Sequence, residues 1–145
     1  MKITKGLDMK QFIIAFLSAV VVVQTFASDG GKEIRSSIVL KDECSSETKF
    51  NQLFELSSSS KYTGTAQIQY LAEANETSFM NCPEEFLSSM IKSSEKERNA
   101  VLRHFGIVMA PWDIADKLNM FRQRSEYKEL IETRLSGFFK IKKPF

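Results

Sequence analysis

The chain opens with an apolar run, residues 12–23, that divides it into a targeting segment and a part that folds. The run reads FIIAFLSAVVVV and follows three lysines. Polar residues begin at Ser28, directly after the small residue Ala27. A basic start, a short apolar core and a small residue before a polar break are typical of a secretory signal peptide. The sequence therefore predicts a signal peptide over residues 1–27, cleaved after Ala27.

An uncleaved membrane anchor is the alternative interpretation of this run. A helix needs roughly 20 apolar residues to cross a bilayer, and this run has about 12 to 16. Met9 begins MKQFIIAF, which is a compact signal by itself, so the true start stays open between Met1 and Met9. We expect no stable membrane insertion after cleavage, and a periplasmic or secreted location.

Removal of the leader changes the charge of the chain. The whole sequence has a net charge of +2, whereas residues 28–145 contain 17 basic and 17 acidic residues. Acidic residues dominate residues 28–91, by ten to five, and basic residues dominate 92–145, by twelve to seven. Either the two halves pack together and attract weakly, or an acidic face meets a basic partner. A neutral mature chain disfavours nucleic acid as a partner.

The two cysteines, Cys44 and Cys82, both belong to the mature part. Exported chains meet an oxidising compartment in which thiols pair, and two cysteines allow one intramolecular bridge. The chain-entropy model gives such a bridge about 4 kcal/mol of stabilisation. A redox or nucleophilic cysteine is the weaker alternative, because the chain has no Cys-x-x-Cys pair. The sequence predicts a Cys44–Cys82 disulfide.

The mature part has the pattern of an all-α protein. Apolar residues recur at helical spacing behind local start signals, which are proline at the first helical position or a serine cap. Nine phenylalanines follow Ala27 and supply bulky core volume. We predict one α-helical domain over residues 28–145, a small compact bundle of five or six short helices. The expected helix starts lie at Ser46, Pro83, Ser94 with Glu97, Pro111 and Ser125, and Gly106 is a candidate C-cap.

Residues 62–80 are ambiguous between helix and strand. Ala66, Ile68 and Tyr70 alternate with polar residues, as in a strand. Leu71 and the alanines that follow it have high helix propensity. We predict a helix there, with a strand as the alternative.

The sequence contains no catalytic constellation. His104 is the only histidine, so a Ser-His-Asp triad or a histidine metal site would depend on that residue alone. If the cysteines pair, the remaining metal ligands are carboxylates. The glycines form neither a dinucleotide fingerprint nor a phosphate loop. We predict no catalytic residues, no metal and no cofactor.

Four residues are candidate contacts with a partner protein. Trp112 and Asp113 combine an aromatic residue with an acid, a composition found at binding hot spots. Glu84 and Glu85 are the tightest acid pair of the mature part. Each has a structural interpretation: Trp112 can cover the core, and acids at a helix start offset the dipole. The serine-rich segment 57–60 is a further candidate loop.

The plan of an exported helical domain with one disulfide resembles that of small periplasmic immunity proteins, which neutralise cell-wall-attacking toxins, and of acid-stress chaperones. The likeness covers the plan and no motif residue. It implies a non-catalytic binder that blocks another protein, such as a toxin or hydrolase. The alternatives are a secreted enzyme or toxin that uses carboxylate or serine chemistry, and a periplasmic chaperone. The oligomeric state stays open.

Overall fold

The computed structural model describes residues 30–145, and every regular element in that range is helical. The predicted signal peptide and its cleavage site lie outside the described residues. The all-α prediction is confirmed, with seven α-helical segments in 30–145 where five or six were expected. They are residues 30–36, α2 (Glu47–Ser58), α3 (Thr65–Asn81), α4 (Pro83–Lys92), α5 (Glu95–His104), α6 (Pro111–Asn119) and α7 (Ser125–Leu130).

Shorter turns complete the chain. The 3-10 turn η1 (Lys41–Glu43) precedes α2, and the π-helical turn η2 (Ile131–Leu135) continues α7 into the 3-10 turn η3 (Ser136–Lys140). None of the helices within residues 30–145 is long and apolar enough to cross a membrane.

Most helices begin where proline or a capping serine in the sequence predicted a helix start. Pro83 and Pro111 open α4 and α6, where the missing amide of proline breaks no helical hydrogen bond. The Ser94 hydroxyl accepts from the Glu97 amide, and the Glu97 side chain accepts from Ser94 in return, which completes the predicted capping box. Ser125 is the first residue of α7 rather than its cap, so this start is one residue off. Most of the ambiguous segment 62–80 lies in α3, which begins at Thr65, so the helix prediction is confirmed there.

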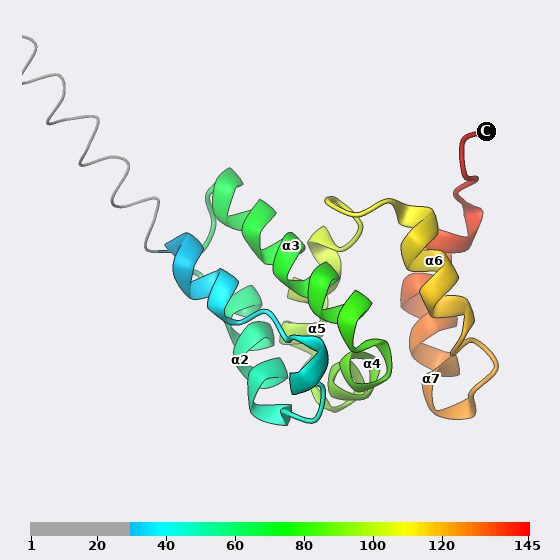
Figure 1. The fold of residues 1–145 in the computed structure, drawn as a ribbon, viewed down its shortest axis with the longest axis horizontal. Helices are drawn as coiled ribbons and strands as arrows, with labels where there is room; N and C mark the ends of the chain where they lie inside the picture. The colour runs from blue at the N-terminus through cyan, green and yellow to red at the C-terminus, as the bar shows by residue number, and fades with distance from the viewer. Residues whose placement is uncertain (1–29) are drawn as a thin grey trace, which may run out of the picture.

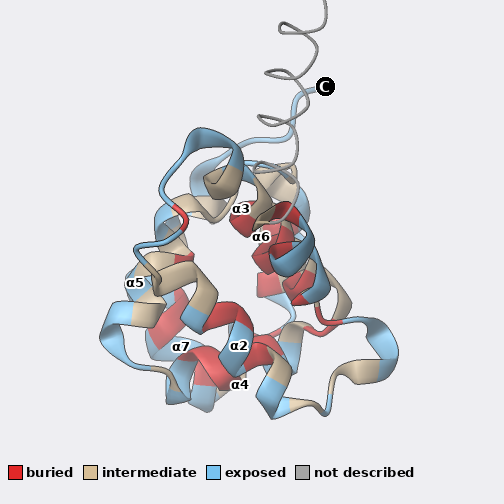
Figure 2. Cartoon of the chain, turned by 90° about the vertical axis from the view of Figure 1, so that its left-hand side faces the viewer, coloured by how far each residue is buried: buried red, intermediate tan, exposed pale blue. Residues whose placement is uncertain are grey.

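The long helix α3 organises the fold. In Figure 1 it crosses the molecule, with α2, α4 and α5 on one side of it. The C-terminal elements α6 and α7 lie at the end opposite residues 30–36, and α7 packs against α4. Figure 2 shows that the buried residues gather where the helices meet. The buried residues form one apolar cluster that draws on all these helices.

Phenylalanine rings fill the centre of this cluster. Phe86 on α4 is the hub, with ring centroids 5.3 Å from Phe54, 5.6 Å from Phe79 and 5.8 Å from Phe105. Edge-to-face and stacked aromatic pairs at such distances stabilise a core beyond the area they bury. Phe105 links the hub to the C-terminal elements, because its centroid lies 5.9 Å from that of Phe138 in η3.

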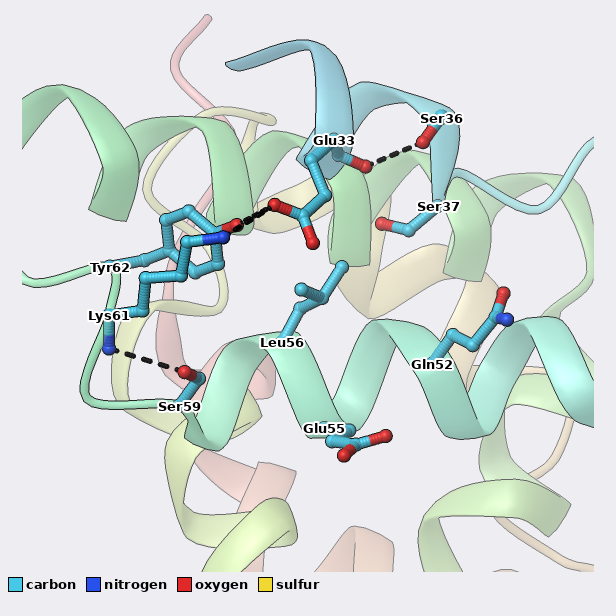
Figure 3. Close-up of a pocket in the computed structure, with 9 residues that line it drawn as sticks. All are labelled: Glu33, Ser36, Ser37, Gln52, Glu55, Leu56, Ser59, Lys61 and Tyr62. Carbon is cyan, nitrogen blue, oxygen red and sulfur yellow. Dashed lines mark hydrogen bonds and ion pairs between the residues drawn. The ribbon is translucent and has the colours of Figure 1, made fainter. Parts of the chain in front are cut away.

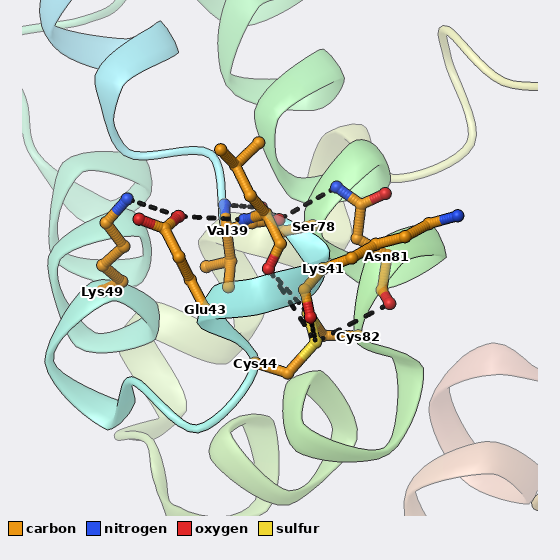
Figure 4. The surroundings of a disulfide bond; sticks show 9 residues. Val39, Lys41, Glu43, Cys44, Lys49, Ser78, Asn81 and Cys82 are labelled. Carbon is orange, nitrogen blue, oxygen red and sulfur yellow. Dashed lines mark hydrogen bonds and ion pairs between the residues drawn. A yellow bond between two sulfur atoms is a disulfide. The ribbon is translucent and has the colours of Figure 1, made fainter.

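The Cys44–Cys82 disulfide joins the turn before α2 to the start of α4 (Figure 4). This confirms the predicted pairing across 38 residues. Hydrogen bonds hold Val39 against α3: its amide donates to the Ser78 hydroxyl over 2.9 Å, and its carbonyl accepts from the Asn81 side-chain amide over 3.0 Å. The disulfide therefore closes a segment that is already bonded to α3.

Candidate functional site

A buried carboxylate holds the loop between α5 and α6. Glu76 on α3 is 0% exposed, and its Oε1 accepts from the amides of Gly106, Ile107 and Val108 over 2.8, 2.9 and 3.2 Å. Its Oε2 accepts from the Met109 amide. Successive backbone amides that converge on one anion form a nest, and here the anion is a side chain of the protein itself. Four consecutive residues of the loop are thereby fixed to α3, the longest helix within residues 30–145.

The start of this loop is fixed by packing as well. Phe105, the C-cap of α5, lies within the phenylalanine cluster, and Gly106 follows with φ of +91°, a left-handed conformation that favours glycine. A Cβ at Gly106 would lie 2.6 Å from the Phe138 ring. Gly106 was predicted as the C-cap, but the C-cap of α5 is Phe105 and Gly106 is the left-handed residue that follows it, so this prediction is one residue off. The loop is thus determined by backbone conformation, by ring packing and by the Glu76 carboxylate together.

The tip of the loop is apolar and faces solvent. Ile107 is 58% exposed and Val108 43% exposed. Single exposed apolar side chains are ordinary on protein surfaces. Here two adjacent ones stand on a backbone that hydrogen bonds hold in place, and they form a small apolar patch of fixed shape. We define residues 105–110 as the tip loop. Its geometry suits insertion into a complementary surface of another protein.

Two of the predicted partner residues directly follow the tip loop. Trp112 and Asp113 occupy the first turn of α6, which begins at Pro111. Trp112 is half-buried, and Asp113 is exposed. The Asp113 amide donates to the Ala110 carbonyl over 3.0 Å, which connects the loop end to the helix start. This pair is therefore next to the apolar tip, in the same stretch of chain.

The other predicted pair lies elsewhere. Glu84 and Glu85 are exposed in the first turn of α4 and line a pocket of about 290 Å³ beside the disulfide. Glu84 accepts from the Arg124 guanidinium over 2.9 Å, and Arg124 also binds Glu126. Asp113 borders a different pocket with Met80 and Met120. The two predicted pairs thus line different surfaces.

A further pocket of about 450 Å³ lies between residues 30–36 and α2 (Figure 3). Its most connected group is Glu33, whose Oε2 accepts from the Tyr62 hydroxyl and from the Lys61 ammonium, the latter over 3.0 Å. These two donors hold the pKa of Glu33 below its usual range. Burial, and then the hydrogen bond to Glu33, raise the pKa of Tyr62. Glu33, Lys61 and Tyr62 therefore bind one another, and the cluster joins the first helical segment to the α2–α3 connection.

The histidine and the carboxylates that could serve catalysis line different pockets, the carboxylates of one of them being Glu47, Glu84 and Glu85 beside the disulfide. His104 lines one with the serines of segment 57–60, and no carboxylate of residues 30–145 is among the lining side chains there. The Figure 3 pocket has Glu33, Glu55 and serines, and within the described chain its lining includes no histidine. No group of three or more His, Cys, Asp or Glu side chains in residues 30–145 could hold a metal ion.

Sequence reasoning missed Glu76. Its position in the sequence did indicate burial. Ala72, four residues before Glu76, and Phe79, three residues after it, are both buried, so the three residues share the buried face of α3. An acid on such a face needs partners, since an unpaired buried charge is strongly unfavourable. The sequence therefore contained the anomaly but not its partner.

Comparison with known proteins found no match: no protein-family model, no curated protein and no solved structure matches this chain.

Proposed function

We propose that this chain is an exported, non-catalytic protein-binding domain of the immunity or inhibitor type, which blocks another protein with its tip loop. The observation that carries this proposal is the Glu76 carboxylate, which fixes the amides of 106–109 beneath an exposed apolar tip. A loop that is ordered before binding loses little conformational entropy when a partner engages it. Partners in preorganised inhibitor complexes accordingly change little on binding.

Neighbouring residues support a contact larger than the tip alone. Trp112 and Asp113 continue the surface from the loop into α6, and an aromatic residue beside an acid can combine apolar burial with a charged contact. We therefore place the centre of the contact on Ile107 and Val108 and its edge on Trp112 and Asp113. Glu84 and Glu85 would serve as a second, separate contact.

Affinity capture from the periplasmic or extracellular fraction of the source cells tests this proposal. The bait is the disulfide-bonded chain, compared with the double variant Ile107→Ser, Val108→Ser. The matched control is Ile91→Ser, because Ile91 on α4 is 40% exposed and lines a pocket that contains none of the proposed contact residues. We expect one protein to be captured by the wild type and by the control, and to be lost from the double variant.

The captured protein is then purified and mixed with the chain to measure whether its own activity falls. Suppression at a defined stoichiometry, lost in the double variant, supports the inhibitor assignment. Absence of any captured protein, or equal capture by the double variant, would overturn it.

Export is tested separately, by mass spectrometry of the protein isolated from its source. We expect a mature chain that begins at Ser28 and carries no free thiol, because the leader is removed where the cysteines oxidise. An intact leader with two free thiols would contradict export and leave the loop proposal to stand without it.

A further inference from the structure

A pocket of about 460 Å³ opens between α5 and the connection from α2 to α3. α5 supplies Lys96, Ala100 and Arg103, spaced so that they share one helix face, and His104 at its end. The facing wall is lined by the serines of segment 57–60 and by Thr63, Ile68 and Leu71. The Ser57 and Ser58 hydroxyls in it donate to the Leu53 and Glu55 carbonyls of α2. The volume lies within the range of small-molecule sites.

The charged side chains that line this pocket, Lys96 and Arg103, are both cationic. Lys96 and Arg103 are exposed, and the salt bridges of residues 30–145 are formed by other cations. No aspartate or glutamate of the described chain is among the lining residues. Two cations without a lining carboxylate form an arrangement that suits an anion.

His104 is the last residue of α5 and is half-buried. Burial, and then the Arg103 charge, lower the pKa of His104. The charged or titratable side chains that line the pocket with it are Lys96 and Arg103 on α5 and Tyr62 from the α2–α3 connection. An anion bound here would favour the imidazolium form and reverse part of that shift.

We propose that this pocket binds a small ligand with an oxyanion group, namely phosphate, sulfate or carboxylate, attached to a ring. Arg103 and Lys96 bind the oxyanion, because a guanidinium pairs with two oxygens at once and an ammonium adds a point charge. The ring packs on Ile68, Leu71 and Ala100. This site is separate from the tip loop and does not depend on the proposed inhibitor function.

The competing explanation is that Arg103 and His104 only offset the negative end of α5, and that Lys96 is an ordinary exposed cation. Arg103 and His104 belong to its last turn, where cations stabilise the helix dipole. This explanation predicts no saturable ligand binding, so a titration separates the two.

The test is an NMR titration of the disulfide-bonded chain with inorganic phosphate, phenyl phosphate and, at matched ionic strength, sodium chloride. His104 is the only histidine, so its ring resonance is an unambiguous probe. We expect saturable shifts at His104 and in segment 57–60 with both phosphates, tighter binding of phenyl phosphate, and no saturation with chloride. A pH titration in sulfate, whose charge is fixed between pH 5 and 8, should show a higher His104 pKa than one in chloride.

Matched variants locate the site. Arg103→Gln should raise the Kd for phenyl phosphate about tenfold, as expected when one charged hydrogen-bonding group is lost. Lys96→Gln should raise it less, and Lys128→Gln on α7 should leave it unchanged. The proposal would be overturned if the phosphates gave unsaturable shifts like those of chloride, or if Lys128→Gln raised the Kd for phenyl phosphate as much as Arg103→Gln. Equal affinity for inorganic phosphate and phenyl phosphate would overturn the ring contact.

Discussion

Replacing Glu76 with glutamine tests whether the carboxylate fixes the tip loop. The variant keeps the shape of the side chain but removes its charge and exchanges one acceptor oxygen for an NH₂ group. If the remaining oxygen faces Gly106, Ile107 and Val108, three hydrogen bonds persist in neutral form. The Met109 amide then faces a donor instead of an acceptor.

The expected loss can be worked from these four contacts. Hydrogen bonds to a charged group contribute about 1.5–3 kcal/mol and neutral ones about 0.5–1.5, so three weakened bonds lose about 3 kcal/mol. An unsatisfied amide adds about 1–3 kcal/mol. Burying a neutral amide in place of a carboxylate offsets part of this sum. We expect Glu76→Gln to lower the free energy of unfolding by about 2–4 kcal/mol.

Urea unfolding measures this loss, and amide hydrogen exchange shows where it occurs. Glu73→Gln is the control, because Glu73 is one turn earlier on α3 and half-buried. We expect Glu76→Gln to lose amide protection at residues 106–109 and Glu73→Gln to retain it. A Glu76→Gln variant as stable as the control, with residues 106–109 still protected, would refute the role given to the carboxylate.

Three further changes have defined outcomes. Gly106→Ala should lower the free energy of unfolding by about 1–3 kcal/mol, because alanine is strained at φ of +91°; a thermal melt as high as wild type would contradict this. Replacing both Cys44 and Cys82 with alanine should lower it by about 4 kcal/mol, and urea unfolding under non-reducing conditions checks this value. The Ser94 hydroxyl and amide hold the pKa of Glu97 below its ordinary value, so the stability that Glu97 adds is complete above about pH 4.5 and disappears as the pH falls further. The difference in stability between wild type and Glu97→Gln should therefore shrink between pH 5 and pH 3, and a constant difference would exclude this linkage.

Features set by neighbouring residues could be predicted from the sequence. The starts of α4, α5 and α6 followed from Pro83, Ser94 and Pro111, because caps and proline act within one helical turn. The disulfide followed because only Cys44 and Cys82 were available.

Features set by distant residues could not be predicted. The amides that bind Glu76 are 30 to 33 residues away in the chain, and Arg124 binds Glu84 from 40 residues away. Nothing local encodes such a pair, because it depends on how helices pack. Trp112 was predicted as a contact residue, but the apolar surface next to it was not. The exposure of Ile107 and Val108 depends on how the helices pack.

The most direct test of the central claim is the backbone mobility of the tip loop in the free protein. Nitrogen-15 relaxation of the Ile107 and Val108 amides reports motion on the picosecond to nanosecond timescale. A loop fixed by Glu76 before any partner arrives predicts order parameters of about 0.85, like those of the helices around it. Values below about 0.6 would show a flexible loop and contradict the account.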